Sequence, residues 1–299
     1  MNVLLTGATG FIGSNLFLKL KKNKHHVTGL ALKQEKIANQ KILALDIKNR
    51  KNVQDFFSHH KFDAVIHLAA AVPPKFTNSL EEKKIFDDNF LGTSILLDAF
   101  SRSRAGLFVY ASSISVIGQP LSSCVDETHP LKPNNFYSLS KLFGEMLGRQ
   151  YALATDKTFI GFRITAPYGP GQRLKTVLNI FLENALKSKD LEVFGKGKRA
   201  QDFIYIDDLT DAFLLALKAK KSGIFNIGSG QSVSSSELAK KVLENCPGNK
   251  SKIIFKGVDN QESYRLKVNI EKAKKILKFR PKHDIDTGIK EYLKYLVRE

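Results

Sequence analysis

The 299-residue sequence contains no tryptophan and only two cysteines, and several classes of protein are excluded by what it lacks. Cys124 and Cys246 lie far apart, without the short spacing of metal-binding pairs, so we expect neither a disulfide framework nor a metal site. No apolar run approaches the ~18 residues that a membrane-spanning helix needs. An early glycine-rich segment also interrupts the charged-then-apolar layout of a secretory signal. These features predict a cytoplasmic protein with no membrane partner.

Acidic residues are scarce as well, since 29 Asp and Glu stand against 47 Lys and Arg, which gives a formal net charge of +18. Such a charge raises nucleic acid as a partner. The lysines, however, are scattered in short groups near the expected helix ends, where cations favour the helix dipole. No basic stretch alternates with aromatic residues. We therefore expect no nucleic-acid partner and favour an anionic small substrate.

Length and hydrophobic pattern predict the fold class. A chain of 299 residues is long enough for about two domains, or for one large α/β domain with an appendage. Short apolar segments alternate with segments of helical period, and the expected strands are residues 2–5, 26–32, 41–45, 62–68 and 106–111. This alternation predicts an α/β fold with a parallel, doubly wound sheet.

Two of the expected helices carry residues of interest. One opens at Asn89 with the sequence NFLGTSILLDAF. Another is capped by Asn134 and Asn135, and its expected core stripe consists of Leu139, Phe143, Met146 and Tyr151. Tyr137 and Lys141 are four residues apart, so we expect them to share the opposite face of this second helix.

Three glycines punctuate the turn that follows the first strand, within the sequence TGATGFIG (6–13). Gly7 allows a tight turn, Gly10 lets the backbone approach a pyrophosphate, and Gly13 lets the following helix pack closely. Phe11 and Ile12 begin that helix, whose free N–H groups suit phosphate. The spacing is GxxGxxG rather than GxGxxG, but its position between a strand and a helix predicts nucleotide binding.

The end of the second strand bears on which nicotinamide cofactor binds. A carboxylate about 20 residues past the glycines usually holds the adenosine ribose 2′-hydroxyl of NAD. This chain has Ala31 and Leu32 there, followed by Lys33, which favours NADP because a lysine neutralises a 2′-phosphate. Alternatively, Lys33 is a solvated loop residue and NAD binds. Asp46 and Ile47, after the third strand, are expected to contact the adenine.

A Tyr–Lys pair and a strand-end serine suggest hydride-transfer chemistry. Moving a hydride between a sugar carbon and nicotinamide requires a proton to move on or off the attached oxygen. Lys141 and the positive nicotinamide ring favour the phenolate of Tyr137, which then serves as the acid–base group. Ser113 is placed to hydrogen-bond the same oxygen. Ser112 points to the other face of the strand and is expected to be structural.

Motifs spread over nearly the whole chain resemble an extended short-chain dehydrogenase/reductase of the nucleotide-sugar epimerase/dehydratase family. They are TGATGFIG (6–13), HLAA (67–70), NFLGT (89–93), SSISVIG (112–118), YSLSK (137–141), FRITAPYGPG (162–171), QDFIYIDDL (201–209), FNIGSG (225–230) and YRLKVNIEKA (264–273).

The resemblance implies a Rossmann-type domain that binds NAD(P), over residues 1–165 with a return near 201–228. A smaller C-terminal α/β part, residues 166–200 and 229–299, is implied to bind a nucleotide diphosphate sugar. Ser113 and Tyr137 are implied to contact the sugar oxygen, Lys141 the nicotinamide ribose, and Arg265 the substrate diphosphate. Further cofactor contacts are expected from Asp46, Ile47, Leu68, Ala69, Ala70, Asn89, Tyr137, Lys141, Ile164 and Thr165.

The sequence departs from the family pattern at several positions. Family dehydratases carry an Asp-Glu pair immediately after the position of Ser113, and this chain has Ile114 and Ser115 there, which argues against 4,6-dehydration. The usual Asn before the PYG segment is Ala166, and the usual Arg before DF is Gln201. We expect Ala166 and Gln201 to line a non-standard substrate pocket, with Arg199 as a candidate substitute for the missing arginine.

These features predict an NAD(P)-dependent nucleotide-sugar epimerase that resembles 4-epimerases and is expected to form a homodimer. An NADPH-dependent ketosugar reductase is the alternative, because it shares the machinery and fits a preference for NADP. A non-catalytic sensor or scaffold that binds NADP is a third possibility, and the intact Ser113, Tyr137 and Lys141 set argues against it.

Overall fold

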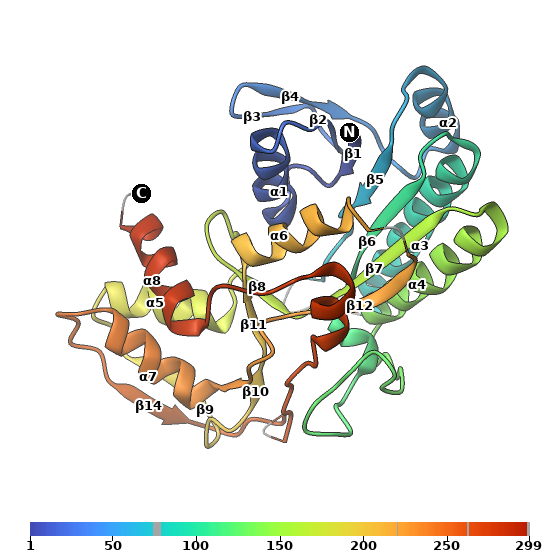
Figure 1. Cartoon of the computed structure of the whole chain (residues 1–299). Helices are drawn as coiled ribbons and strands as arrows, with labels where there is room; N and C mark the ends of the chain where they lie inside the picture. The colour runs from blue at the N-terminus through green and yellow to red at the C-terminus, as the bar shows by residue number, and fades with distance from the viewer. Residues whose placement is uncertain (74–78, 220, 262, 298–299) are drawn as a thin grey trace.

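A central eight-stranded sheet organises the computed structural model, which describes residues 1–73, 79–219, 221–261 and 263–297 (Figure 1). Its strands lie in the order β12-β7-β6-β5-β1-β2-β4-β3. All neighbours are parallel except β3, which pairs antiparallel with β4. The strands are β1 (Asn2–Thr6), β2 (His26–Ala31), β3 (Glu35–Ile37), β4 (Gln40–Ala44), β5 (Ala64–His67), β6 (Leu107–Ser113), β7 (Thr158–Ile164) and β12 (Gly223–Ile227). The predicted Rossmann-type, doubly wound α/β fold is confirmed, and the sequence did not predict three strands of its sheet, the hairpin strand β3 and the strands β7 and β12.

Helices cover both faces of this sheet, as Figure 1 shows. On one face lie α1 (Phe11–Lys22) and α6 (Ile206–Ala216), and on the other lie α2 (Arg50–His59), α3 (Ser79–Arg102) and α4 (Phe136–Thr155). Alternate strand residues supply the two cores: Val3 and Leu5 belong to one buried cluster and Leu4 to the other. This burial on both sides explains why the strands are nearly continuous apolar runs.

The helix expected to open at Asn89 in fact begins at Ser79, so Asn89 lies inside α3. The helical turns before Asn89 are mostly polar, so the apolar pattern did not indicate that they are helical. Pairs spaced four apart, such as Lys83 with Asp87 and Lys84 with Asp88, support this solvated extension of the helix.

The core stripe predicted for α4 is wrong at two of its four residues, whereas Leu139 and Tyr151 are half-buried. Phe143 and Met146 are exposed, and the buried face instead carries Ser138, Ser140, Lys141, Gly144, Glu145, Gly148 and Ala152. The reason is volume: a Cβ at Gly144 would lie 2.3 Å from the Tyr110 ring of β6, and one at Gly148 would lie 2.0 Å from the Phe159 ring of β7. Large aromatic side chains of the sheet already fill the space, so small residues must face them.

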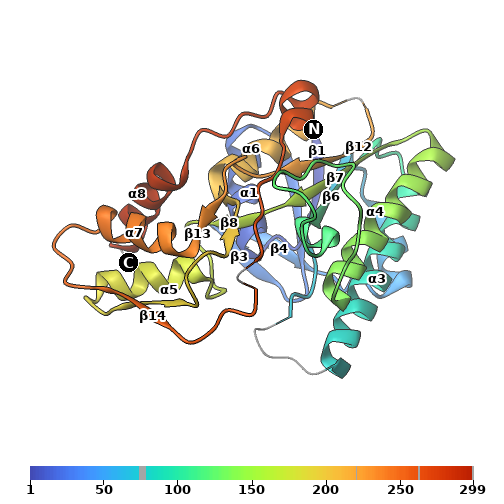
Figure 2. The ribbon, with the colours of Figure 1, turned by 90° about the horizontal axis from the view of Figure 1, so that it is seen from below.

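The aromatic face of α4 packs against α3 instead, and Figure 2 shows these two helices side by side along one flank. The Phe143 ring lies edge-on to Phe90 at 5.3 Å and to Phe86 at 5.8 Å between ring centroids. The helix that carries Tyr137 and Lys141 is therefore held between the sheet and α3.

A smaller C-terminal part lies beside the carboxyl edge of the sheet (Figures 1 and 2). It contains the strand pairs β9 (Leu191–Phe194) with β14 (Ile253–Lys256) and β10 (Ala200–Gln201) with β13 (Val233–Ser234). Its helices are α5 (Val177–Leu186), α7 (Ser235–Asn245) and α8 (Ile285–Leu296). The short parallel pair β8 (Ala166–Tyr168) and β11 (Phe203–Tyr205) connects it to the large sheet.

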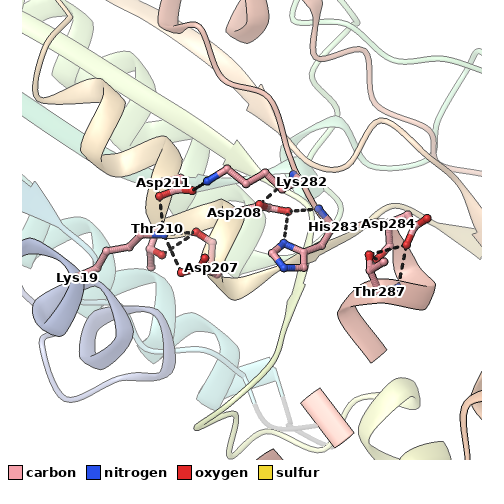
Figure 3. A network of polar contacts seen from close by, with 9 residues as sticks. All are labelled: Lys19, Asp207, Asp208, Thr210, Asp211, Lys282, His283, Asp284 and Thr287. Carbon is pink, nitrogen blue, oxygen red and sulfur yellow. Dashed lines mark hydrogen bonds and ion pairs between the residues drawn. The ribbon is translucent and has the colours of Figure 1, made fainter. Parts of the chain in front are cut away.

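A polar network ties the segment before α8 back to helices α6 and α1 (Figure 3). The buried carboxylate of Asp208 accepts the backbone N–H groups of Lys282 and His283, at 3.0 and 2.9 Å, and also contacts His283 Nδ1 at 3.1 Å. Lys19 of α1 pairs with Asp207 and Asp211 of α6, at 2.7 and 2.5 Å. The C-terminal segment is thereby fixed to the Rossmann-type layer.

No helix in the described part of the chain has both the length and the apolar content needed to cross a membrane. Within the same residues, no group of three or more His, Cys, Asp or Glu side chains is placed to hold a metal ion. Cys124 and Cys246 are free thiols, the first exposed and the second buried.

Candidate functional site

The carboxyl ends of the central strands lie side by side. Thr6 pairs with His67, His67 with Tyr110, and Ser113 with Ile164 across neighbouring strands. The loops that follow these residues therefore meet at one edge of the sheet, where doubly wound folds bind their ligands. The chain brings the glycine turn, residues 68–71, Ser113 and Thr165 to this edge.

The glycine turn is closed so tightly that side chains have no room. Gly7 has a φ of +69°, and a Cβ there would lie 2.7 Å from the backbone N of Ala69. A Cβ at Gly13 would lie 2.0 Å from the Gly7 carbonyl oxygen, so the third glycine packs on the turn itself. Gly10 is the N-cap of α1, and the first-turn N–H groups of that helix have no partner within the helix. These features fit a pyrophosphate-containing cofactor.

A buried histidine links three elements under this edge. The Nδ1 of His67 lies 2.7 Å from the Thr6 hydroxyl, and its Nε2 lies 3.0 Å from the hydroxyl of Thr93 on α3. The Thr6 hydroxyl also accepts the N–H of Ala69 at 3.3 Å. Burial, with the charge of Lys141, lowers the pKa of His67 to about 3, so its ring is neutral and serves to hold the strand ends together.

Asn89, expected to contact the cofactor, makes its hydrogen bonds to the protein. Its Oδ1 accepts the N–H of Ala71 at 2.7 Å, and its Nδ2 donates to the Ala71 carbonyl at 3.0 Å and to Ser140 Oγ at 3.2 Å. The loop after β5 is thereby fixed to α4. Leu68, Ala69 and Ala70 precede this clamp and are partly exposed.

The Ser, Tyr and Lys candidates gather beside this loop. Ser113 ends β6 and caps the short helix η1 (Ile114–Ile117). Lys141 Nζ is buried, donates to the Ala111 carbonyl at 2.8 Å, and lies 5.7 Å from the ring centroid of Tyr137. The structure therefore joins the end of β6 to the first turns of α4, as acid–base chemistry at a single oxygen requires.

Burial perturbs both titratable members of this group. It raises the pKa of Tyr137 to about 12 and lowers the pKa of Lys141 to about 8. In the protein alone, desolvation thus outweighs the effect of the lysine, contrary to the expectation that the phenolate is favoured. Lys141 nevertheless stays mainly protonated at pH 7, so its charge is available to a phenolate.

A buried ion pair one helical turn beyond Lys141 is a feature that the sequence reasoning missed. Glu145 of α4 and Arg163 of β7 form a two-pronged pair, with contacts of 3.0 and 2.8 Å. Ser112 Oγ also donates to Glu145 at 2.5 Å, which agrees with its expected structural role. The signal was present, because Glu145 follows Lys141 by four residues and so shares its helix face.

The expected substrate residues meet where the C-terminal part joins the sheet. Ala200 bridges to Arg265, which sets the latter beside Arg199 and Gln201 of the neighbouring segment. The Arg265 guanidinium donates to the Tyr264 carbonyl at 3.1 Å. The Nε of Arg199 is buried and has no hydrogen-bond partner in the described residues.

Asp202 is a further residue that sequence reasoning missed. It is fully buried and accepts the N–H groups of Ser229 and Gly230, at 2.7 and 2.9 Å. Its backbone carbonyl accepts the N–H of Ala166 at 3.1 Å, and its Oδ1 lies 3.5 Å from the Thr165 hydroxyl. Burial raises its pKa to about 7. Asp202 thus fixes the chain around Thr165 and Ala166.

The adenosine candidates lie farther along the edge. Lys33 is exposed and has no hydrogen bond or ion pair to any described residue, while Asp46 accepts the N–H of Lys48 at 2.9 Å. The unpredicted hairpin places Glu35 and Lys36 on the wall of a cavity of about 410 Å³ that Thr9 of the glycine turn also lines. The end of β2 has no carboxylate, whereas β3 carries Glu35, which is followed by the cation Lys36.

Ile47, the other residue expected to contact the adenine, packs against Gly92 of α3. The contact is so close that a Cβ added at Gly92 would lie 2.8 Å from Ile47 Cδ1.

Comparison with known proteins adds a family and several relatives. The sequence pattern of the NAD dependent epimerase/dehydratase family matches residues 3–228. A protein of Methanocaldococcus jannaschii provisionally assigned as a UDP-glucose 4-epimerase is 32% identical, over 98% of each chain. A dTDP-glucose 4,6-dehydratase of Streptomyces niveus is 26% identical, over 99% of this chain and 92% of the other. The crystal structure of a UDP-glucose 4-epimerase from Thermotoga maritima with UDP-glucose superposes with a TM-score of 0.91 at 27% identity, covering 100% of this chain and 99% of that one.

Proposed function

Because this chain belongs to the NAD dependent epimerase/dehydratase family, we propose that it is an NAD(P)-dependent nucleotide-sugar epimerase acting at C4 of the sugar. The observation that carries this proposal is the gathering of Ser113, Tyr137 and Lys141 beside a glycine turn that fits a pyrophosphate. Each of the three has a role in moving a proton while a hydride moves.

The geometry supports the following roles. Bound NAD(P) supplies the hydride acceptor and, when oxidised, a positive charge. Ser113 hydrogen-bonds the C4 oxygen of the sugar, and Tyr137 takes the proton of that oxygen as the C4 hydride leaves, which gives a 4-ketosugar. Lys141 supplies the nearby positive charge that a phenolate at this buried site requires. The glycine turn of Gly7, Gly10 and Gly13 would hold the cofactor, which would supply reversible hydride transfer at C4, and Tyr137 returns the proton to the oxygen of the epimer.

Epimerisation is favoured over 4,6-dehydration by what surrounds Ser113. Dehydration needs an acid and a base near C5 and C6 of the sugar. Ile114 carries neither and is buried, and the hydroxyl of Ser115 is engaged with Ser113 and Ser138. The dehydratase relatives share the fold, and we propose that this chain does not share their elimination step.

The substrate is proposed to be a nucleotide diphosphate sugar held between the sheet edge and the C-terminal part. Arg199 and Arg265 offer cations for the diphosphate, and the unpartnered Nε of Arg199 supports such a ligand. Ala166 and Gln201 would leave more room, or different polar contacts, than the asparagine and arginine usual at these positions.

An NADPH-dependent ketosugar reductase is the second candidate, supported by the cations near the expected 2′-phosphate position, Lys33 and Lys36. Glu35 in the same cavity favours the 2′-hydroxyl of NAD instead. Binding of either cofactor is therefore proposed, and Lys33 is the residue whose removal separates the two cases.

The test is to incubate the full chain with NAD and UDP-glucose deuterated at C4, and to follow the sugar by NMR. We expect UDP-galactose that retains the deuterium, because the same hydride leaves and returns. A reductase would instead consume NADPH in proportion to added ketosugar. A 4-keto-6-deoxy product, lighter by one water, would show a dehydratase and refute the proposal. UDP-N-acetylglucosamine and dTDP-glucose extend the same test to other sugars and bases.

We also propose that the protein forms a homodimer through the outer faces of α3 and α4. Met146 is 58% exposed, Phe143 40% and Leu91 44%, and these residues lie on adjacent helices. Exposed apolar side chains on neighbouring helices are typical of an interface between subunits. Light scattering after size exclusion should give twice the chain mass, and Met146→Lys should shift the protein toward the monomer.

A further inference from the structure

Three serine hydroxyls form a hydrogen-bonded chain that ends at Ser113. Ser138 Oγ donates to Ser115 Oγ at 2.9 Å, and Ser115 Oγ donates to Ser113 Oγ at 2.9 Å. The backbone N–H of Ser115 donates to the same Ser113 oxygen at 3.2 Å. Ser113 Oγ therefore accepts two hydrogen bonds from within the protein.

This arrangement decides what the Ser113 hydroxyl can do. A serine hydroxyl has one proton to donate and two lone pairs to accept with. Both lone pairs are used by Ser115, so the proton is left to point elsewhere. We propose that Ser115, held by Ser138, is a positioning residue that makes Ser113 a hydrogen-bond donor to the reacting sugar oxygen. The inference rests on the proposed hydride-transfer function.

The consequence is a fixed direction for the proton. A sugar oxygen that accepts from Ser113 must direct its own proton toward Tyr137, the other group that touches it. Ser113 cannot take that proton without losing a bond to Ser115, which leaves Tyr137 as the single acid–base group. As the sugar oxygen gains negative charge, a donor already aimed at it stabilises the transition state more than the ground state.

The hydrogen-bonded serine hydroxyls also set the spacing between the strand that carries Ser113 and the helix that carries Tyr137. Ser138 is fully buried in the first turn of α4, next to Tyr137, and its N–H donates to the cap residue Asn135 at 2.8 Å. Ser115 lies in η1, the short helix that Ser113 itself caps. The hydroxyl chain therefore connects the start of the Tyr137 helix to the end of the Ser113 strand.

Position 115 is where the resembling dehydratases carry the glutamate of their Asp-Glu pair. In this chain a hydroxyl stands there and is committed at both ends, as acceptor from Ser138 and as donor to Ser113. The hydroxyl of Ser115 is therefore used to orient Ser113.

The experiment measures turnover of UDP-glucose by the NAD-loaded full chain carrying Ser115→Ala, Ser115→Thr or Ser122→Ala. Ser115→Ala removes one donor and should lower kcat about fivefold, the effect of one hydrogen bond. KM for UDP-glucose and affinity for NAD should stay within about twofold, since binding surfaces are untouched. Ser115→Thr keeps the hydroxyl and should retain kcat. Ser122 is an exposed serine that takes no part in the hydrogen-bonded row of hydroxyls, and its own hydroxyl donates to the Cys124 carbonyl. Its alanine variant is the matched control.

A double-mutant cycle separates positioning from general structure. If Ser115 acts through Ser113, adding Ser115→Ala to Ser113→Ala should cost no further activity. Additive losses, or a Ser115→Ala kcat within twofold of wild type, would overturn the inference.

If the wild-type protein does not act on UDP-glucose, the result contradicts the proposed function and leaves the inference about Ser115 to a structural test. Crystal structures of wild type and Ser115→Ala then decide the inference alone. In wild type, Ser113 Oγ should lie within hydrogen-bond distance of both Ser115 atoms, and in Ser115→Ala its side chain should turn. A wild-type Ser113 hydroxyl that faces away from Ser115 would overturn it.

Discussion

The buried pair of Glu145 and Arg163 provides a sharp test of how α4 is held. The two side chains are 3% and 4% exposed and share contacts of 2.8 to 3.2 Å. Glu145→Gln keeps the shape of the side chain and removes its charge. Among the described residues, the buried guanidinium of Arg163 is then left with the Glu127 carbonyl, at 3.2 Å, and a neutral amide as its partners.

The expected loss of stability is large. Removing one partner of a buried ion pair costs about 3–5 kcal/mol, because the remaining charge stays desolvated. The total free energy of unfolding of a domain is about 5–15 kcal/mol, so the variant should lose about a fifth or more of it. The hydrogen bond that Ser112 donates to the Glu145 carboxylate, at 2.5 Å, is also weakened, because its acceptor is no longer charged. This weakening adds to the loss of stability.

Urea titration followed by circular dichroism measures this effect. Asp87→Asn is the control, because it also replaces one carboxylate of an ion pair by an amide. The side chains of this pair, Lys83 and Asp87, are 60% and 53% exposed rather than buried. An exposed pair of this kind contributes under ~1 kcal/mol. The double variant Glu145→Met/Arg163→Met should be more stable than either single Met variant, since no unpaired charge is left inside.

A free energy of unfolding for Glu145→Gln within 1 kcal/mol of wild type would refute this reasoning. So would a double Met variant that loses the sum of its two single losses. Either result would mean that water or a shifted α4 relieves the buried charge.

Four further predictions concern the candidate site. Tyr137→Phe should keep the fold and cofactor binding but lose about 10²-fold or more in kcat, since it removes only the acid–base hydroxyl; near-wild-type turnover would contradict the assignment. Lys141→Met should weaken NAD(P) binding and move the acidic limb of the pH–rate profile to higher pH, because losing a cation raises the pKa of the neighbouring phenol; an unmoved limb with unchanged cofactor affinity would mark an uninvolved lysine. Gly13→Val should abolish NAD binding in a fluorescence titration, because its Cβ would meet the turn at 2.0 Å, whereas Gly106→Ala, with nothing within 4 Å, should bind normally. If NADP is preferred, Lys33→Ala should lower its affinity roughly tenfold or more in a salt-dependent way and leave NAD unchanged; equal affinities for both cofactors in wild type would reject the preference.

The sequence by itself determined five of the eight strands of the sheet, the glycine turn and the family. Short apolar runs encode strands because both faces are buried, and glycine spacing encodes a turn that no side chain fits. These signals are local, so they can be read residue by residue. The same holds for Tyr137 and Lys141, whose spacing of four residues places them on one helix face wherever that helix packs.

Tertiary structure alone decided which face of α4 is buried. The sequence favoured the face with Phe143 and Met146, yet Tyr110 and Phe159 of distant strands fill the space beneath the helix and admit only small residues. Tertiary structure also decided the hairpin that brings Glu35 and Lys36 to the cavity lined by Thr9, because β3, which pairs with β4, carries little apolar pattern.

The hydroxyl chain is the clearest case of information that only the fold contains. Ser113, Ser115 and Ser138 are common residues with no distinctive spacing, and nothing in the sequence indicates which atom donates to which. Their roles arise when the end of β6 and the start of α4 meet, because a hydrogen bond depends on distance and direction between atoms rather than on residue type.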